Sequence, residues 1–249
     1  PSIQRTPVLY QAGASSKGLA FATQHAEAMF IGADTPEKLK QQVDKIRALA
    51  LSHGRDEQAI KLFVGISVVT AETDELAQEK LAEYIRYASP EAGLVHFSSS
   101  VGIDLAQFTD DEAIPYKQTN SIASVNNKFK EQKVTRADLK DQHVLGGRYP
   151  LIVGSGKTVA EKLILLIDET GVDGFNLTRT VAPESHQDFI RWVIPELQER
   201  SRYKNAYETG SLRHKLFAQG DRLAADHPVQ QYRCQSSCAH PKTQQKQTV

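Results

Sequence analysis

The sequence predicts an α/β protein built on a parallel β-sheet. Strand-like apolar segments alternate with amphipathic helical segments, which is the order of repeated β–α units. The composition suits a folded chain of 249 residues, because 40 % are hydrophobic and 24 % are charged. Four convincing strands stand out, whereas a complete (β/α)8 barrel of about 250 residues needs eight. The chain therefore fits either half of a barrel or a small open sheet.

The first elements are two short strands with a helix between them. Residues 8–13 form an apolar run that ends in a glycine turn, and residues 28–32 form a second run. A helical stretch over residues 16–25 joins the two. The alternation of strand and helix therefore starts at the beginning of the chain.

The clearest helix is predicted between Thr35 and Gly54. Thr35 is a favoured N-cap residue, Pro36 occupies the first helical position, and Gly54 is a typical stop. The apolar positions between them recur at helical spacing and lie on one face, namely Leu39, Val43, Ile46 and Ala50.

Residues 60–70 are almost continuously apolar and β-branched, as expected of a strand covered on both faces. Thr73 is the predicted N-cap of the next helix. The inner stripe of that helix is predicted to contain Ala77, Leu81, Tyr84, Ile85 and Ala88.

Regularity breaks over residues 90–150, and a stretch of this length inside a compact domain is typical of a functional insertion. Order returns with a short apolar run at 151–153, a helix over about 156–169 and a strand at 174–178. An amphipathic helix follows, and Pro195 is expected to interrupt it. We interpret residues 1–233 as one part of a barrel, and residues 234–249 as a polar, unstructured tail.

Composition narrows the possible functions. Thirty Lys and Arg balance thirty Asp and Glu, so the formal net charge of +0 argues against a nucleic-acid partner. No run approaches the roughly 18 apolar residues that a membrane span needs, and residues 1–7 contain no signal-peptide core. The two cysteines give no disulfide framework, so we expect a reducing, cytoplasmic setting. The sequence begins at Pro1, without Met, almost directly on a strand-like segment, which fits either a processed terminus or a fragment. Because only four strands are counted, we expect a fragment of a longer protein.

The strongest candidate site lies where the first strand meets the first helix. This junction contains Gly13, Ala14, Ser15 and Ser16. A glycine turn lets backbone N–H groups approach an anion, the helix N-terminus adds positive potential, and a serine hydroxyl can donate to a phosphate oxygen. In a parallel barrel, sites lie at this carboxyl face. The alternative is that Ser15 or Ser16 only caps its own helix.

Residues 154–158, Gly-Ser-Gly-Lys-Thr, end like a P-loop. The motif needs a glycine five residues before the Gly-Lys pair, and Leu151 stands there instead. We therefore interpret the segment as a helix start capped by Ser155.

His96 lies in the predicted insertion, beside serines. A histidine can orient a substrate or move a proton near neutral pH, although a lone histidine is more often structural. Cys234, Cys238 and His240 provide too few ligands for zinc, so no metal site is predicted.

Several blocks of sequence resemble one family, in the same order. They are residues 1–15 with Phe21-Ala22 and 25–28, then 60–65, 102–105, 173–177, 193–198 and 212–217. Together they resemble the nitrilotriacetate monooxygenase component A branch of the luciferase-like flavin monooxygenases. That branch also includes long-chain alkane and dibenzothiophene-sulfone monooxygenases. The resemblance covers roughly residues 1–233.

The resemblance implies the C-terminal half of a (β/α)8 TIM barrel of the bacterial-luciferase type, from the fifth strand onward, with a helical or irregular insertion at about 90–150. It further implies that a separate flavin reductase supplies reduced FMN, and that O2 is the co-substrate for oxygenation of a small organic molecule. Ser15 would contact the FMN phosphate, with Gly13, Ala14 and Ser16 beside it, and His96 would lie near the substrate.

The chain departs from the family pattern after Gly13-Ala14. The family usually has a small-residue turn such as Ser-Pro there, and this chain has Ser15-Ser16-Lys17. The helix start stays intact, and the charge of Lys17 favours an anion.

Three hypotheses stay open at this point. The first is an FMN-dependent monooxygenase, and the second is a non-catalytic half-barrel that associates with a partner or with itself as a homo-oligomer. The third is a phosphate-ligand binder that uses residues 154–158.

Overall fold

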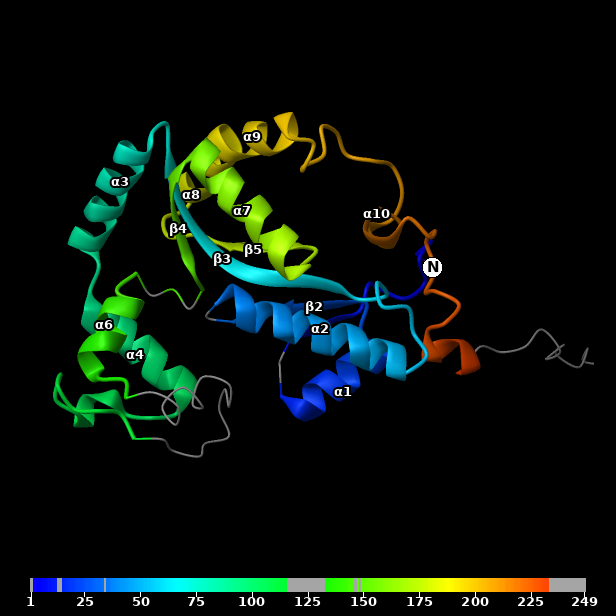
Figure 1. Ribbon diagram of the computed structural model, residues 1–249, viewed down its shortest axis with the longest axis horizontal. Coiled ribbons are helices and arrows are strands. Elements are labelled where there is room, and N and C mark those ends of the chain that lie inside the picture. Colours follow the sequence, from blue (N-terminus) through cyan, green and yellow to red (C-terminus); the bar gives the residue numbers. More distant parts are fainter. Residues whose placement is uncertain are drawn as a thin grey trace, which may run out of the picture.

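The computed structural model describes residues 2–12, 15–33, 35–115, 133–145, 147 and 149–232. Its centre is a curved sheet in which all pairings are parallel (Figure 1). The five strands are β1 (Tyr10–Ala12), β2 (Ala28–Ile31), β3 (Lys61–Ala71), β4 (Leu151–Ser155) and β5 (Gly174–Thr178). The predicted α/β class with a parallel sheet is confirmed.

The long strand β3 has neighbours on both edges. Phe63 is in register with Phe30 of β2 on one edge and with Gly174 of β5 on the other. Further along, Ser67 is in register with both Leu151 and Thr178, so β4 also lies opposite β5. Strands β2 and β4 therefore pair with the same edge of β3, and β4 begins beyond the carboxyl end of β2.

The sequence-based strand count needs a correction. The apolar run at 151–153 looked short, but the structure extends it to the five-residue strand β4, so the sheet has five strands and not four. Gly154 and Ser155 complete the strand because β3 runs on far enough to pair with them.

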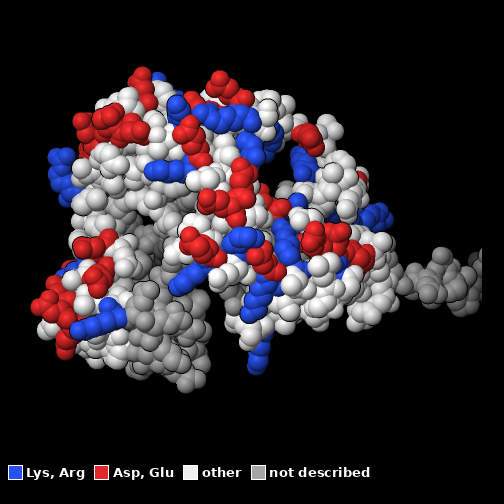
Figure 2. Space-filling view, in the orientation of Figure 1, with Lys and Arg blue, Asp and Glu red and all other residues white. Residues whose placement is uncertain are grey.

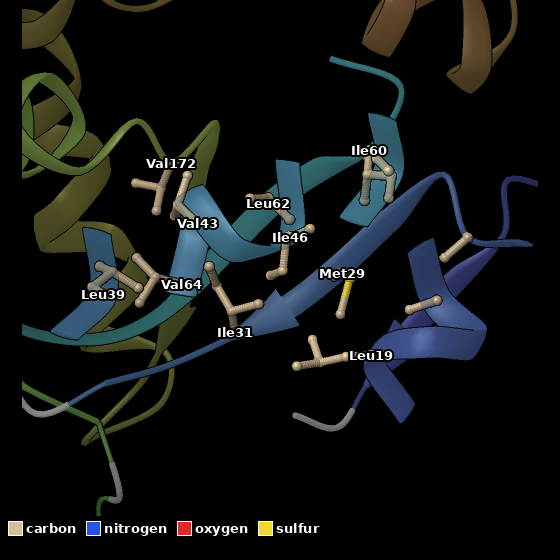
Figure 3. Packing of buried hydrophobic residues seen from close by; sticks show 13 residues of the cluster. Leu19, Met29, Ile31, Leu39, Val43, Ile46, Ile60, Leu62, Val64 and Val172 are labelled. Atoms are coloured by element: carbon tan, nitrogen blue, oxygen red, sulfur yellow. The ribbon is translucent and has the colours of Figure 1, made fainter. Parts of the chain in front are cut away.

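Helices α1 (Ser16–His25), α2 (Pro36–Ser52) and α7 (Gly156–Thr170) contribute to the cores on one face of the sheet. The predicted cap of α2 is confirmed, because the Thr35 side chain accepts a hydrogen bond from the Lys38 N–H. In Figure 3, apolar side chains of β2 and β3 point toward those of α2, with Leu19 of α1 beside Met29. The four predicted inner positions of α2 are all buried, namely Leu39, Val43, Ile46 and Ala50.

The helical path after β5 continues past Pro195. Helix α8 (Glu184–Asp188), the π-helical turn η2 (Phe189–Val193) and α9 (Ile194–Glu199) follow one another without a break. The predicted interruption near Pro195 therefore takes the form of a π turn between two α-helical segments, and the helical path itself continues. A wider π turn ahead of the proline accommodates its missing N–H, which an uninterrupted α-helix cannot.

Helix α3 (Asp74–Tyr87) leaves the sheet and leads to a lobe made of α4 (Pro90–Val101), η1 (Leu105–Gln107) and α6 (Arg136–His143) (Figure 1). This lobe has its own core, in which Leu94, Phe97 and Leu139 are buried. The predicted inner stripe of α3 is only partly correct: Ala77 is fully buried, while Ile85 is 43 % exposed. The second half of α3 extends beyond the sheet, so it has less to pack against.

A buried ion pair ties the end of the described chain to its beginning. Arg213 of α10 (Leu212–Phe217) donates to both carboxylate oxygens of Glu27, at 2.6 and 2.9 Å. The same guanidinium donates to the carbonyls of Thr6 and Pro7, and Glu27 accepts from the Leu9 N–H. A buried charge pair with these additional partners holds β1 and β2 against α10.

Candidate functional site

The strand-to-helix junction after β1 lies at the carboxyl edge of the sheet. Ser15 is the N-cap of α1, and its hydroxyl accepts a hydrogen bond from the Gly18 N–H at 3.1 Å. The capping interpretation of Ser15 is therefore confirmed, and Ser16 is the first helical residue. Ser15, Ser16 and Lys17 are exposed, and the first turn of α1 contains no acidic residue. Gly13 and Ala14 lie outside the described residues.

The N-terminus of α7 differs sharply from that of α1, because a carboxylate from the chain itself occupies it. The Ser155 N–H donates to Asp74 Oδ1 at 2.6 Å, and the Thr158 hydroxyl donates to Asp74 Oδ2 at 3.0 Å. These bonds, the Ser155 N–H first among them, hold the pKa of Asp74 below its usual value. Helix α7 therefore already has its anion.

The glycines of the 154–158 segment have structural reasons of their own. Gly154 has a φ of 156°, and a Cβ there would lie 2.8 Å from the Asp74 carboxylate. A Cβ on Gly156 would lie 2.0 Å from the Trp192 carbonyl oxygen, so α7 and η2 approach closely because this residue is glycine. The resemblance to a P-loop thus reflects helix packing and an internal cap.

The face of the sheet opposite the helices carries a row of aromatic rings. Tyr10 stacks on Phe30 with 5.5 Å between ring centroids, and Phe63 lies 6.4 Å from Phe30. Tyr10 is 42 % exposed and Phe30 39 %. In a parallel barrel this face is the interior, which layers of side chains fill. We call it the inward face.

One level nearer the carboxyl edge, glycines leave room on the inward face. A Cβ on Gly32 would meet no heavy atom within 4 Å, while one on Gly65 would lie 2.3 Å from the ring of Tyr149. The Tyr149 ring therefore lies directly over Gly65. Tyr149 is not among the residues predicted from the sequence. The available signal was Gly65, which falls on the inward face by strand alternation with Phe63.

An open cavity of about 610 Å³ lies between α3, the start of α4 and the segment that follows β5. Its polar centre is Tyr84, whose hydroxyl donates to Glu184 at 2.6 Å. Lys80 bonds Asp188 at 2.5 Å and lies 3.6 Å from Glu184. The lining residues are Glu83, Tyr84, Tyr87, Ala88, Ser89, Ala92, Gly93, Val144, Leu145, Thr180, Val181 and Glu184.

Burial and the neighbouring carboxylate of Glu184 raise the pKa of Tyr84 well above that of a free phenol. Tyr84 is therefore a neutral hydrogen-bond donor at physiological pH. Helical spacing predicted Tyr84 on the inner stripe of α3. Its contact with Glu184 could not be predicted from this pattern, because 100 residues separate the two.

His96 lies on the exposed side of α4, and its backbone carbonyl accepts from the Ser100 hydroxyl at 3.0 Å. Within the described part of the chain, no hydrogen bond or ion pair joins His96 to Ser15. The structure thus places the two predicted site residues on separate elements: His96 lies on α4 of the lobe, and Ser15 lies at the N-terminus of α1.

Cys234, Cys238 and His240 lie outside the described residues. Over the part of the chain that the structure describes, no three His, Cys, Asp or Glu side chains are grouped to hold a metal ion. Within the same described ranges, none of the helices combines the length and apolar character needed to cross a membrane. Positive and negative side chains are interspersed over the face shown in Figure 2.

Comparison with known proteins gives a consistent result. Residues 1–174 match the family model of the luciferase-like monooxygenases. The chain is 40 % identical over 238 residues to dimethyl-sulfide monooxygenase from Hyphomicrobium sulfonivorans, covering 94 % of this chain and 50 % of the relative. The crystal structure of DmoA from the same organism superposes with a TM-score of 0.83, at the same identity and coverage.

Two other proteins extend the comparison. Long-chain alkane monooxygenase from Geobacillus thermodenitrificans is 41 % identical over 239 residues, which are 95 % of this chain and 51 % of that protein. A riboflavin lyase, solved with a modified FMN and riboflavin, is 35 % identical and superposes with a TM-score of 0.85. The match covers 93 % of this chain and 52 % of the lyase chain. The chain thus spans about half the length of the curated relatives it matches. By sequence and by fold, it belongs to the luciferase-like monooxygenase family.

Proposed function

We propose that the protein containing this chain uses reduced FMN and O2 to oxygenate a small organic substrate, and that the N-terminus of α1 holds the FMN phosphate. The observation that carries the proposal is the difference between two helix starts. The carboxylate of Asp74 occupies the N-terminus of α7, whereas the N-terminus of α1 is exposed at the carboxyl edge and has no acidic residue in its first turn. An anion that binds at this edge therefore has α1 available.

The hydroxyl of Ser15 can cap the helix and bind phosphate together. Its oxygen accepts from the Gly18 N–H, which leaves its own hydrogen free to donate to a phosphate oxygen. The backbone N–H groups of Gly13, Ala14 and Ser16 and the charge of Lys17 are the further contacts that we propose. The capping and cofactor interpretations of Ser15 are thus compatible.

When bound, reduced FMN supplies the electrons with which one atom of O2 enters the substrate while the other leaves as water. The chain supplies the phosphate anchor, the inward face and the lobe on the carboxyl side. A separate flavin reductase is the proposed source of reduced FMN, as the family resemblance implies. Dimethyl sulfide and long-chain alkanes, which the names of two relatives suggest, are suitable first substrates to test.

Replacing Ser15 with Ala tests the phosphate anchor in the native polypeptide that carries this sequence. We expect the dissociation constant of reduced FMN, measured by anaerobic titration, to rise about tenfold, because one hydrogen bond to a charged group contributes about 1.5 kcal/mol. Ser155→Ala removes the matching cap of α7 and is the control. Both variants lose about 1 kcal/mol of folding stability. Equal flavin affinities in the two variants would rule out the anchor.

His96 is the residue that we propose on the substrate side, since it is exposed on α4 of the lobe. His96→Ala is expected to lower kcat about 100-fold, the smaller end of a general acid–base effect, without changing the affinity for reduced FMN. Steady-state kinetics with the best substrate of the panel provide the measurement. An unchanged kcat would remove His96 from the chemistry.

A further inference from the structure

Two segments that line the cavity lead directly to the carboxyl end of the inward face. On one side, Thr178 is in register with Ser67, and Thr180 lines the cavity two residues later. On the other side, Leu145 lines the cavity, and a Cβ on Gly147 would lie 3.7 Å from the Ser67 hydroxyl. Two of the segments that line the cavity therefore adjoin the carboxyl end of the inward face.

The size of the cavity suits a small molecule. Its volume of about 610 Å³ falls inside the range of roughly 300–1,000 Å³ that ligand sites occupy. Most of its lining is aromatic, aliphatic or small. The hydrogen of the Tyr84 hydroxyl is already donated to Glu184, so the ring of Tyr84 offers a ligand mainly its apolar faces.

The charged residues that line the cavity are both acidic. Glu83 and Glu184 contribute carboxylates, and none of the described lining residues is Lys, Arg or His. Two cations lie next to lining residues: Lys80 is shared between Asp188 at 2.5 Å and Glu184 at 3.6 Å, and the guanidinium of Arg86 lies 5.8 Å from the ring of Tyr87. The single charge of Lys80 is thus already shared by two carboxylates, so a carboxylate ligand would enter an environment in which negative charges outnumber positive ones.

We propose that this cavity is the substrate pocket, and that it admits small neutral organic molecules and excludes carboxylates. The proposal rests on the proposed function and names the substrate class of that same site. It assigns the lobe, through Ala92 and Leu145, and the second half of α3, through Tyr84, to substrate binding.

A matched pair of ligands tests the charge preference. 4-Fluorothioanisole is neutral, and (4-fluorophenylthio)acetate has the same ring and sulfur with a carboxylate added. We expect fluorine NMR titration of the native polypeptide, with and without reduced FMN under anaerobic conditions, to show at least tenfold tighter binding of the neutral ligand. Glu83→Lys should reduce this ratio at least fivefold, and Glu79→Lys, one turn earlier on α3 and outside the lining, should leave it unchanged.

A matched pair of variants tests the location. Ala92→Phe on α4 fills the cavity from an exposed position, and Ala82→Phe on α3 places the same ring outside it. The neutral ligand should bind at least tenfold more weakly to the first variant and normally to the second. Binding that is insensitive to Ala92→Phe, absent from the unmodified protein, or equally tight for the carboxylate would overturn the proposal.

The two proposals fail separately. Normal binding of reduced FMN through Ser15, together with ligand binding insensitive to Ala92→Phe, would overturn the pocket alone. Ligand binding that depends on Ala92 in a protein without affinity for reduced FMN would retain a neutral-ligand pocket and overturn the monooxygenase function.

Discussion

At the scale of single residues, two glycines leave space on the inward face near the carboxyl edge. Gly65 admits the Tyr149 ring, and Gly32 leaves open space on the neighbouring strand edge. The two residues occupy comparable places on the inward face, but their surroundings differ. Replacing each with alanine therefore separates the effect of contact from that of backbone entropy.

Gly65→Ala is expected to displace the Tyr149 ring and to lower the free energy of unfolding by about 1–3 kcal/mol, because the new Cβ overlaps ring atoms. Gly32→Ala should be neutral or stabilising by up to about 1 kcal/mol. Urea denaturation of both variants provides the comparison. The double variant Gly65→Ala/Tyr149→Ala should lose less than the sum of its single changes, and strict additivity would contradict the contact.

At the scale of elements, the carboxylate of Asp74 joins the first turn of α3 to the start of α7. The folded state lowers the pKa of Asp74 below the ordinary value of 3.8. Such a group stabilises the fold at pH values above its unfolded pKa, and the stabilisation is lost as the pH falls through the lowered folded pKa.

Asp74→Asn should therefore destabilise the protein near pH 7, and the difference from the unmodified protein should shrink as the pH falls below about 3.8. Thermal unfolding over pH 2.5–7 measures this difference. Glu75→Gln, in the same first turn, is the control. A difference for Asp74→Asn that stays constant over the whole range would contradict the role of the charged form.

Sequence patterns predicted the elements whose reasons are local. Thr35, Leu39 and Ala50 marked α2 through capping and periodicity, and both depend on neighbours within the same helix. Elements that depend on contacts with residues far away in the sequence were harder to predict. The length of β4 depends on the extension of β3, and the path past Pro195 depends on a π turn that the sequence pattern does not indicate.

The candidate site divides in the same way. The serine at the start of α1 was predictable, because a strand, a glycine turn and a helix follow one another in the chain. The contacts of Tyr149 with Gly65 and of Tyr84 with Glu184 join segments far apart in the sequence. Strand alternation marks Gly65 as an inward-facing position, but the sequence does not indicate that Tyr149 covers it or that Tyr84 contacts Glu184.

At the scale of the whole molecule, the inward face of the sheet is only partly covered. Tyr10 and Phe30 are about 40 % exposed on a sheet whose other face is packed by helices. Exposed apolar surface of this kind is typical of an interface.

We therefore expect the 249-residue chain, when prepared alone, to self-associate at micromolar concentration. Tyr10→Ser/Phe30→Ser should shift sedimentation toward the monomer, whereas Tyr207→Ser, which changes a residue 80 % exposed elsewhere, should not. A monomeric unmodified chain at these concentrations would contradict the expectation and would also remove the support for a self-associating half-barrel.

The central claim is that the α1 junction recognises the phosphate of FMN, and riboflavin, which lacks that phosphate, tests it most directly. The measurement is the ratio of dissociation constants for reduced riboflavin and reduced FMN, in the native polypeptide and in its Ser15→Asp variant. Because aspartate still caps a helix but repels phosphate, we predict a ratio above about 100 that falls below about 10 in the variant. Equal affinity for the two flavins, or a ratio that Ser15→Asp leaves unchanged, would contradict the account.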